Sequence, residues 1–183
     1  QKILNEAIEE LKEKEFKDLY KDSGEEKNYV KDLTIDTDFE LLFPDDYVNN
    51  ITERLNLYTD LNELKTEEEL MQFEKELIDR FGPIPIEVED LLNSVRIKWI
   101  ATKYGFEKII MKKNKLIGYF ISDQKSSFYQ SSNFSKILQF VQTHQHICKM
   151  KEKQTRIGLR LLLTFDKIKS INSALENLKQ IDK

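Results

Sequence analysis

His144, His146 and Cys148 form the one group in this sequence that combines metal-ligating residue types at short spacing. Imidazole and thiolate are ligands that zinc prefers in proteins. A strand rises about 3.3 Å per residue, which would place His144 and Cys148 roughly 13 Å apart, too far for zinc bonds of about 2 Å. Two histidines alone make a weak site. We therefore expect structural roles for these residues and no bound metal.

Other types of catalytic site are not indicated either. The five glycines, at positions 24, 82, 105, 118 and 158, lie too far apart to make a phosphate-binding loop. The serine pairs at 126–127 and 131–132 lack the glycine-flanked turn of a nucleophilic serine, which favours helix capping. No spacing marks two carboxylates as an acid and a base. The sequence thus predicts no catalytic residue, no cofactor-binding residue and a domain that is not an enzyme.

Charge is divided unevenly along the chain. Residues 1–82 hold 11 Lys and Arg against 24 Asp and Glu, whereas residues 83–183 hold 18 against 9. An acidic first half favours a basic protein partner, and the second half is compatible with a phosphate backbone.

Within the basic half, five cations alternate like one face of a strand: Lys149, Lys151, Lys153, Arg156 and Arg160. This pattern is typical of a guarded sheet edge and, less often, of a surface that follows phosphates. A nucleic-acid-binding accessory module that uses the basic C-terminal half is therefore the alternative function.

No stretch of the sequence approaches the roughly 18 apolar residues that a membrane span requires. A single cysteine cannot form an internal disulfide bond. We expect a cytoplasmic protein without a membrane partner. The chain starts at Gln1 without a signal-type apolar run, so we expect it to be part of something longer.

The periodicity predicts an α+β fold, with N-terminal helices followed by a small, mostly antiparallel sheet covered by helices. We expect one domain over residues 1–183. A leading helix and loop occupy residues 1–32, a strand plus three helices occupy 33–105, and the sheet with two helices occupies 106–183.

Local signals refine the first part of this prediction. Residues 33–42 alternate like a strand, and a helix with Ile51 and Leu55 on its apolar stripe starts near Asp45. Thr66 and Glu69 form a capping box that opens a second helix. Gly82 and Pro83 end that helix, and Pro85 suits the first turn of a third.

In the second part, Lys113 and Asn114 are the expected turn of a hairpin. A short strand is predicted at 126–129, and Ser132 or Asn133 is the expected cap of a helix. Strands follow at 147–150 and 156–165. Asp166 is the expected cap of the last helix.

The polar face of the second helix is the remaining candidate site. Glu69, Gln72, Glu76, Asp79 and Arg80 stand at offsets of three and four, opposite the apolar stripe. The same spacing would allow Glu76 to pair with Arg80. Composition alone is more typical of an ordinary hydrated helix face.

The segment ELIDRFGPIP, residues 76–85, resembles the C-terminal domains of bacterial transcription-repair coupling factors, the Mfd family. Further matches are ILNEAIEELK near the start, LFPDDYVNNITERLNLYTDL with Pro44, Tyr47, Arg54, Leu55 and Tyr58, and VEDLLNSVRIKWIATKYGFEKI. The resemblance is specific over residues 1–20 and 39–110.

The resemblance implies a regulatory, non-catalytic domain of an ATP-driven DNA translocase that acts on stalled RNA polymerase and recruits nucleotide excision repair. ATP, Mg and DNA would bind other domains of the parent. This domain would pack on the N-terminal UvrB-like module and mask its UvrA-binding surface, an autoinhibitory role. The contact residues would be Glu76, Asp79 and Arg80, supported by Glu69 and Gln72.

Overall fold

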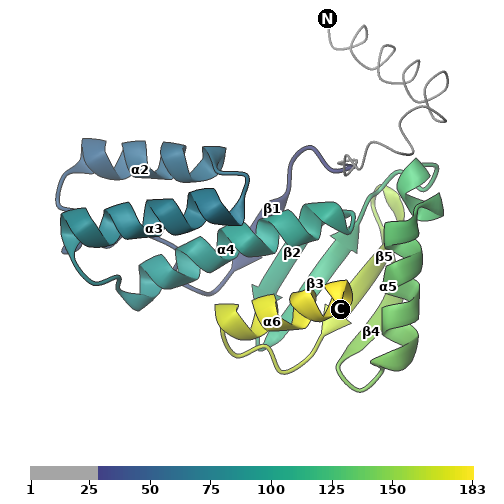
Figure 1. Cartoon of the computed structure of the whole chain (residues 1–183). Coiled ribbons are helices and arrows are strands. Elements are labelled where there is room, and N and C mark those ends of the chain that lie inside the picture. Colours follow the sequence, from purple (N-terminus) through teal and green to yellow (C-terminus); the bar gives the residue numbers. More distant parts are fainter. Residues whose placement is uncertain (1–28) are drawn as a thin grey trace, which may run out of the picture.

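The computed structural model describes residues 29–183, which contain five helices and a five-stranded sheet. Helices α2 (Ile51–Glu63), α3 (Glu67–Phe81) and α4 (Ile86–Lys103) follow the short strand β1 (Thr34–Thr37) and lie together at one end of the molecule (Figure 1). Most of the leading helix and loop predicted over residues 1–32 lies outside the described residues.

The sheet has the strand order β1-β2-β3-β5-β4. Its other strands are β2 (Phe106–Lys112), β3 (Lys115–Phe120), β4 (Cys148–Thr155) and β5 (Gly158–Phe165). Only the pair β1 and β2 is parallel, and the other three pairs are antiparallel. The predicted α+β fold with a mostly antiparallel sheet is thus confirmed.

Two apolar clusters build the core. The larger one joins one face of the sheet to α4, α5 (Ser132–Thr143) and α6 (Ile171–Asp182), through fully buried residues such as Phe106, Phe165 and Leu178. The smaller one holds α2, α3 and the first half of α4 together, with Leu57, Leu70 and others at its centre. Since α4 contributes to both clusters, it connects the helical end to the sheet.

The first strand is shorter than predicted. The structure has β1 only over Thr34–Thr37, whereas the alternation extends over residues 33–42. The Thr37 hydroxyl accepts a hydrogen bond from the Phe39 amide at 3.1 Å and donates one to the Met111 carbonyl at 3.0 Å. This side-chain turn ends the pairing with β2.

The helix expected to start near Asp45 begins instead at Ile51, where Asn50 accepts a hydrogen bond from the Glu53 amide. Leu57 and Leu61 are buried, while Ile51 and Leu55 are 66% and 60% exposed. The prediction that the last two face the core was wrong.

Several predictions for the second half are corrected in detail. Residues Ser127–Gln130 form a 3₁₀ helix rather than a strand, since the Ser126 side chain caps a helical turn there. Ser131 caps α5 and Ser170 caps α6, where an adjacent serine or asparagine and Asp166 were expected. The turn at Lys113 and Asn114 is confirmed, with φ of 52° and 61°. Strand β4 runs five residues past the predicted end at 150, because β5 pairs with it along its whole length.

Among residues 29–183, no helix is both long and apolar enough to cross a membrane.

Candidate partner-binding site

Helix α3 carries all five residues of the predicted contact face, and its start is fixed by two of its own polar groups. The Thr66 hydroxyl accepts a hydrogen bond from the Glu69 amide at 3.2 Å. The Glu69 carboxylate accepts one from the Lys65 amide at 2.8 Å. Glu69 is therefore engaged in capping, one residue outside the usual capping-box geometry, so it contributes first to helix stability.

The end of α3 is held by a tyrosine from the loop before α2. The Tyr47 hydroxyl donates to the Gly82 carbonyl at 2.9 Å and lies 3.3 Å from the Leu77 carbonyl. Burial raises the pKa of Tyr47. Gly82 itself has φ of +88°, a backbone conformation that favours glycine. The last turn of α3, with its charged residues, is therefore rigidly placed.

A groove of about 550 Å³ separates α2 from α3. Its floor is apolar and includes Leu57, Leu64, Phe73 and Leu77. Its rim carries four carboxylates and one cation, together with an amide: Asp60, Glu68, Glu69, Glu76, Arg80 and Gln72. The groove thus offers apolar contact at its base and net negative charge at its edge.

Arg80 does not pair with Glu76, although their spacing on the helix allows it. Its guanidinium forms a salt bridge with Glu53 of α2, across the groove, and lies 4.8 Å from the centre of the Phe81 ring. Glu76 instead accepts a hydrogen bond from the Gln72 amide at 3.3 Å. Arg80 therefore links the two helices that form the groove.

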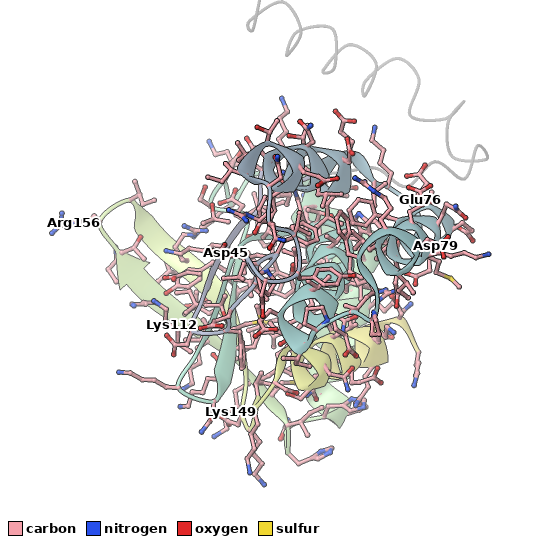
Figure 2. All side chains as sticks on the ribbon, turned by 90° about the vertical axis from the view of Figure 1, so that its left-hand side faces the viewer. Asp45, Glu76, Asp79, Lys112, Lys149 and Arg156 are labelled. Carbon is pink, nitrogen blue, oxygen red and sulfur yellow. The ribbon has the colours of Figure 1, made fainter. Side chains whose placement is uncertain are left out.

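Asp79 is exposed and lies close to Glu76 on the outer side of α3 (Figure 2). It occupies the last turn of the helix, where the macrodipole disfavours a carboxylate. Helix stability therefore does not explain an acidic residue at this position.

The other side of α3 is joined to α4 by a bidentate ion pair. Both Nε and Nη2 of Arg96 donate to the Glu67 carboxylate, at 3.0 Å and 2.6 Å. Hydrogen bonding and the charge of Arg96 lower the pKa of Glu67, and the same hydrogen bond raises the pKa of Arg96. This pair fixes α3 against the helix that leads into the sheet.

Glu53, Asp60 and Glu68 are site residues that sequence reasoning missed. Glu53 and Asp60 stand at offsets of four and three on either side of Leu57 on α2, so helical spacing alone could have placed them beside the same groove. The pairing of Glu53 with Arg80 of α3 could not be obtained that way, because it depends on how the two helices cross.

His144 and Cys148 make contacts within the protein. The buried Cys148 thiol donates to the His144 carbonyl at 3.5 Å, and burial raises the pKa of that thiol to about 11. The His144 ring stacks on Phe140 at 4.0 Å between centroids, near the end of α5. In the part of the chain that the structure describes, three or more potential metal ligands do not cluster anywhere.

Comparison of the sequence with known proteins shows the family to which this chain belongs. The TRCF domain model matches residues 37–131, which include α2, α3, α4 and the first hairpin. The transcription-repair-coupling factor of Rickettsia conorii is 32% identical over 149 residues, which are 81% of this chain and 13% of that protein. The one from Buchnera aphidicola is 34% identical over 155 residues, 84% of this chain and 18% of that protein.

A solved structure supports the fold. The crystal structure of a C-terminal domain of transcription-repair coupling factor superposes with a TM-score of 0.62 at 18% identity, covering 82% of this chain and 93% of that one. The chain therefore spans only a small part of the curated relatives, but most of this separate domain. It belongs to the TRCF domain family, the C-terminal region of transcription-repair coupling factors.

Proposed function

We propose that this chain is a non-catalytic regulatory domain that docks on the N-terminal UvrB-like module of its parent protein and masks the UvrA-binding surface of that module. Its contact face is the groove between α2 and α3 with the outer side of α3. Through the parent it would act indirectly on UvrA and RNA polymerase, while other domains bind ATP and Mg and move along DNA.

The observation that carries this proposal is the combination of an apolar floor with an acidic rim. Four carboxylates and one arginine surround the groove, and the arginine is already paired with Glu53. A partner that presents arginines beside apolar side chains would match both features, because guanidinium groups form bidentate pairs with carboxylates. Glu76 and Asp79 lie next to each other at the edge where such a partner would arrive (Figure 2).

We expect the five contact residues to contribute unequally to binding. Glu76, Asp79 and Arg80 lie in the last two turns of α3, whose end is held by Tyr47. Glu69 lies in the first turn and caps it, so its contribution to binding would be smaller. A contact face on rigid backbone loses little conformational entropy on binding.

The test is direct binding of the purified N-terminal module to the 183-residue chain, by calorimetry. Glu76→Lys with Asp79→Lys should weaken binding at least tenfold, because a charged contact that loses one partner costs about 2–5 kcal/mol when desolvated. The matched control is Glu152→Lys with Glu176→Lys, which makes the same charge change on exposed residues of β4 and α6.

The control pair should bind like the original chain. Circular dichroism and a thermal melt must show that both variants are folded. If the folded α3 variant retains full affinity, or if both variants lose affinity equally, the groove is not the docking site.

A further inference from the structure

The helices of residues 29–183 cover one face of the sheet and leave the other face open. Figure 1 shows α4, α5 and α6 gathered on one side of the sheet, and alternate strand residues point away from them. Leu162 is only 7% exposed yet belongs to neither core cluster, because it lies on this other side. We define the open face by the following side chains of β2, β3, β5 and β4: Lys108, Ile110, Lys112, Lys115, Ile117, Tyr119, Arg160, Leu162, Thr164, Lys149, Lys151 and Lys153.

Strand register arranges the cations of the open face around an apolar centre. Lys151 is opposite Leu162, Leu162 is opposite Tyr119, and Tyr119 is opposite Lys108. A single line across four strands therefore starts and ends with lysine. Three interstrand steps of about 4.8 Å separate the two lysine strands by about 14 Å at the backbone.

Four of these cations are free to meet a ligand. Lys112 pairs with Asp36 at 3.0 Å, Lys115 with Asp166 at 3.8 Å, and Arg160 with Glu107 at 3.1 Å. Within residues 29–183, no ion pair engages the remaining members: Lys108, Lys149, Lys151 and Lys153.

Protection of the sheet edge explains only part of this pattern. Lysines on an edge strand discourage pairing with other chains, and β4 is an edge strand. Lys108 lies on β2, which is flanked by β1 and β3, so it guards no edge. A single ligand that contacts the whole face would explain the positions of all four unpaired lysines.

We propose that the open face binds the phosphate backbone of duplex DNA without reading its sequence. Lys149, Lys151 and Lys153 follow one another every second residue, about 6.7 Å apart, along one border of the face. Lys108 lies three strands away on the inner strand β2, with Thr34 of β1 beyond it. The separation of about 14 Å between the two lysine strands is comparable to the major-groove width of about 12 Å, so the cations can reach the phosphate rows on both sides of that groove.

A duplex fits this face better than a single strand does. Proteins that hold single strands on a sheet stack the bases on exposed aromatic rings. Tyr119 is the aromatic residue of the open face, and the Arg160 guanidinium lies 5.5 Å from its ring centre. The ring is thus already covered, and phosphate contact is the interaction that remains.

The acidic part of the chain does not oppose this binding. Lys112 and Arg156 lie on one side of the molecule, and Glu76 and Asp79 lie on the other (Figure 2). At physiological ionic strength the Debye length is about 8 Å, so charges on opposite sides of a domain are screened from one another. The open face is separate from the proposed docking groove, and one surface can fail its test while the other passes.

The test is fluorescence anisotropy of a labelled duplex with the 183-residue chain at about 50 and 200 mM salt. Four neutralised phosphates give a slope of log K against log salt near −3.6, and affinity should fall about a hundredfold over this range. In Lys149→Gln/Lys151→Gln/Lys153→Gln the slope should shrink to about −1, with at least tenfold weaker binding at the lower salt.

The control variant, Lys65→Gln/Lys75→Gln/Lys98→Gln, removes the same charge from exposed positions in the loop before α3, on α3 and on α4, and should bind like the original. Lys108→Gln alone, on an inner strand, should also reduce the slope, which covers the case in which the triple variant unfolds. The proposal is overturned if the chain does not bind duplex at low salt. It is also overturned if both triple variants lose equal affinity, if the single strand binds more tightly, or if polyglutamate at equal charge displaces the duplex.

Discussion

The Tyr47 hydroxyl donates a hydrogen bond of 2.9 Å to the carbonyl of Gly82, joining the loop before α2 to the end of α3. The two residues are 35 positions apart in the sequence. This bond satisfies a carbonyl at a helix terminus, where no intrahelical donor exists. The charged end of the proposed docking face therefore depends on a residue outside it.

Tyr47→Phe should lower the free energy of unfolding by about 1 kcal/mol, because it removes one donor and leaves the Gly82 carbonyl without it. Urea denaturation of the 183-residue chain measures this change. Tyr119→Phe is the control, since the stacking of Tyr119 with Arg160 uses the ring and not the hydroxyl. Its effect should stay within about 0.5 kcal/mol. Equal losses in both variants would show that the Gly82 contact is not important.

A second prediction concerns Gly105, at the end of α4. It has φ of +78°, and a Cβ at this position would lie 2.4 Å from the Phe128 ring. Gly158 also has a positive φ, of +119°, but a Cβ there meets nothing within 4 Å. Both alanine variants carry backbone strain of about 1–3 kcal/mol, and only Gly105→Ala adds a clash in the core.

We therefore expect the melting temperature of Gly105→Ala to fall clearly further than that of Gly158→Ala. Differential scanning calorimetry of the two variants decides between them. An equal decrease would mean that the Phe128 ring moves aside without cost.

Much of the helical end could be predicted from the sequence, because its signals are local. Thr66 and Gly82 mark the two ends of α3 through their own backbone preferences. Leu55 was misplaced because α2 carries apolar side chains on more than one side. The side with Leu57 and Leu61 packs in the smaller core cluster, and the side with Leu55 stays exposed.

Contacts between distant segments could not be predicted in this way. The pairing of Arg80 with Glu53 spans 27 positions, so helical offsets within α3 do not reveal it. Lys149, Lys151 and Lys153 share a strand face by simple alternation. The alignment of Lys151 with Lys108 follows from the register of three successive strand pairs, which alternation does not determine.

The third prediction is a pH dependence from the Glu67–Arg96 pair. The pKa of Glu67 is lower in the folded chain than in the unfolded one, because Arg96 hydrogen-bonds to the ionised carboxylate. The contribution of this pair to stability is therefore present above the ordinary glutamate pKa of about 4.3 and is lost as the pH falls through the lowered folded value. Both side chains are partly exposed, which limits the contribution to about 1 kcal/mol or less.

Thermal melts of the original chain and of Glu67→Gln at pH 7 and pH 3 measure the contribution of this pair. The melting temperatures of the two proteins should differ at pH 7 and converge at pH 3. Glu68→Gln, one residue along the same turn, removes a carboxylate that lines the groove and should show the smaller difference at pH 7. A gap that persists unchanged in acid would contradict the assignment.

The last prediction separates the two roles of Arg80. Its salt bridge to Glu53 is exposed, so each alanine variant should lose less than about 1 kcal/mol of stability, and a double-mutant cycle should give a coupling of about 0.2–1 kcal/mol. Binding to the N-terminal module should respond differently. Arg80→Ala removes a side chain at the proposed contact face, whereas Glu53→Ala leaves that side chain in place and frees its guanidinium. We expect Arg80→Ala to weaken binding by at least fivefold and Glu53→Ala by less than twofold. Calorimetric titration measures the affinity of both single variants for the N-terminal module. Urea denaturation of the original chain, the two single variants and the double variant gives the free energies of unfolding for the cycle. If the two variants lose equal affinity, Arg80 acts only by joining α2 to α3 and not by touching the partner.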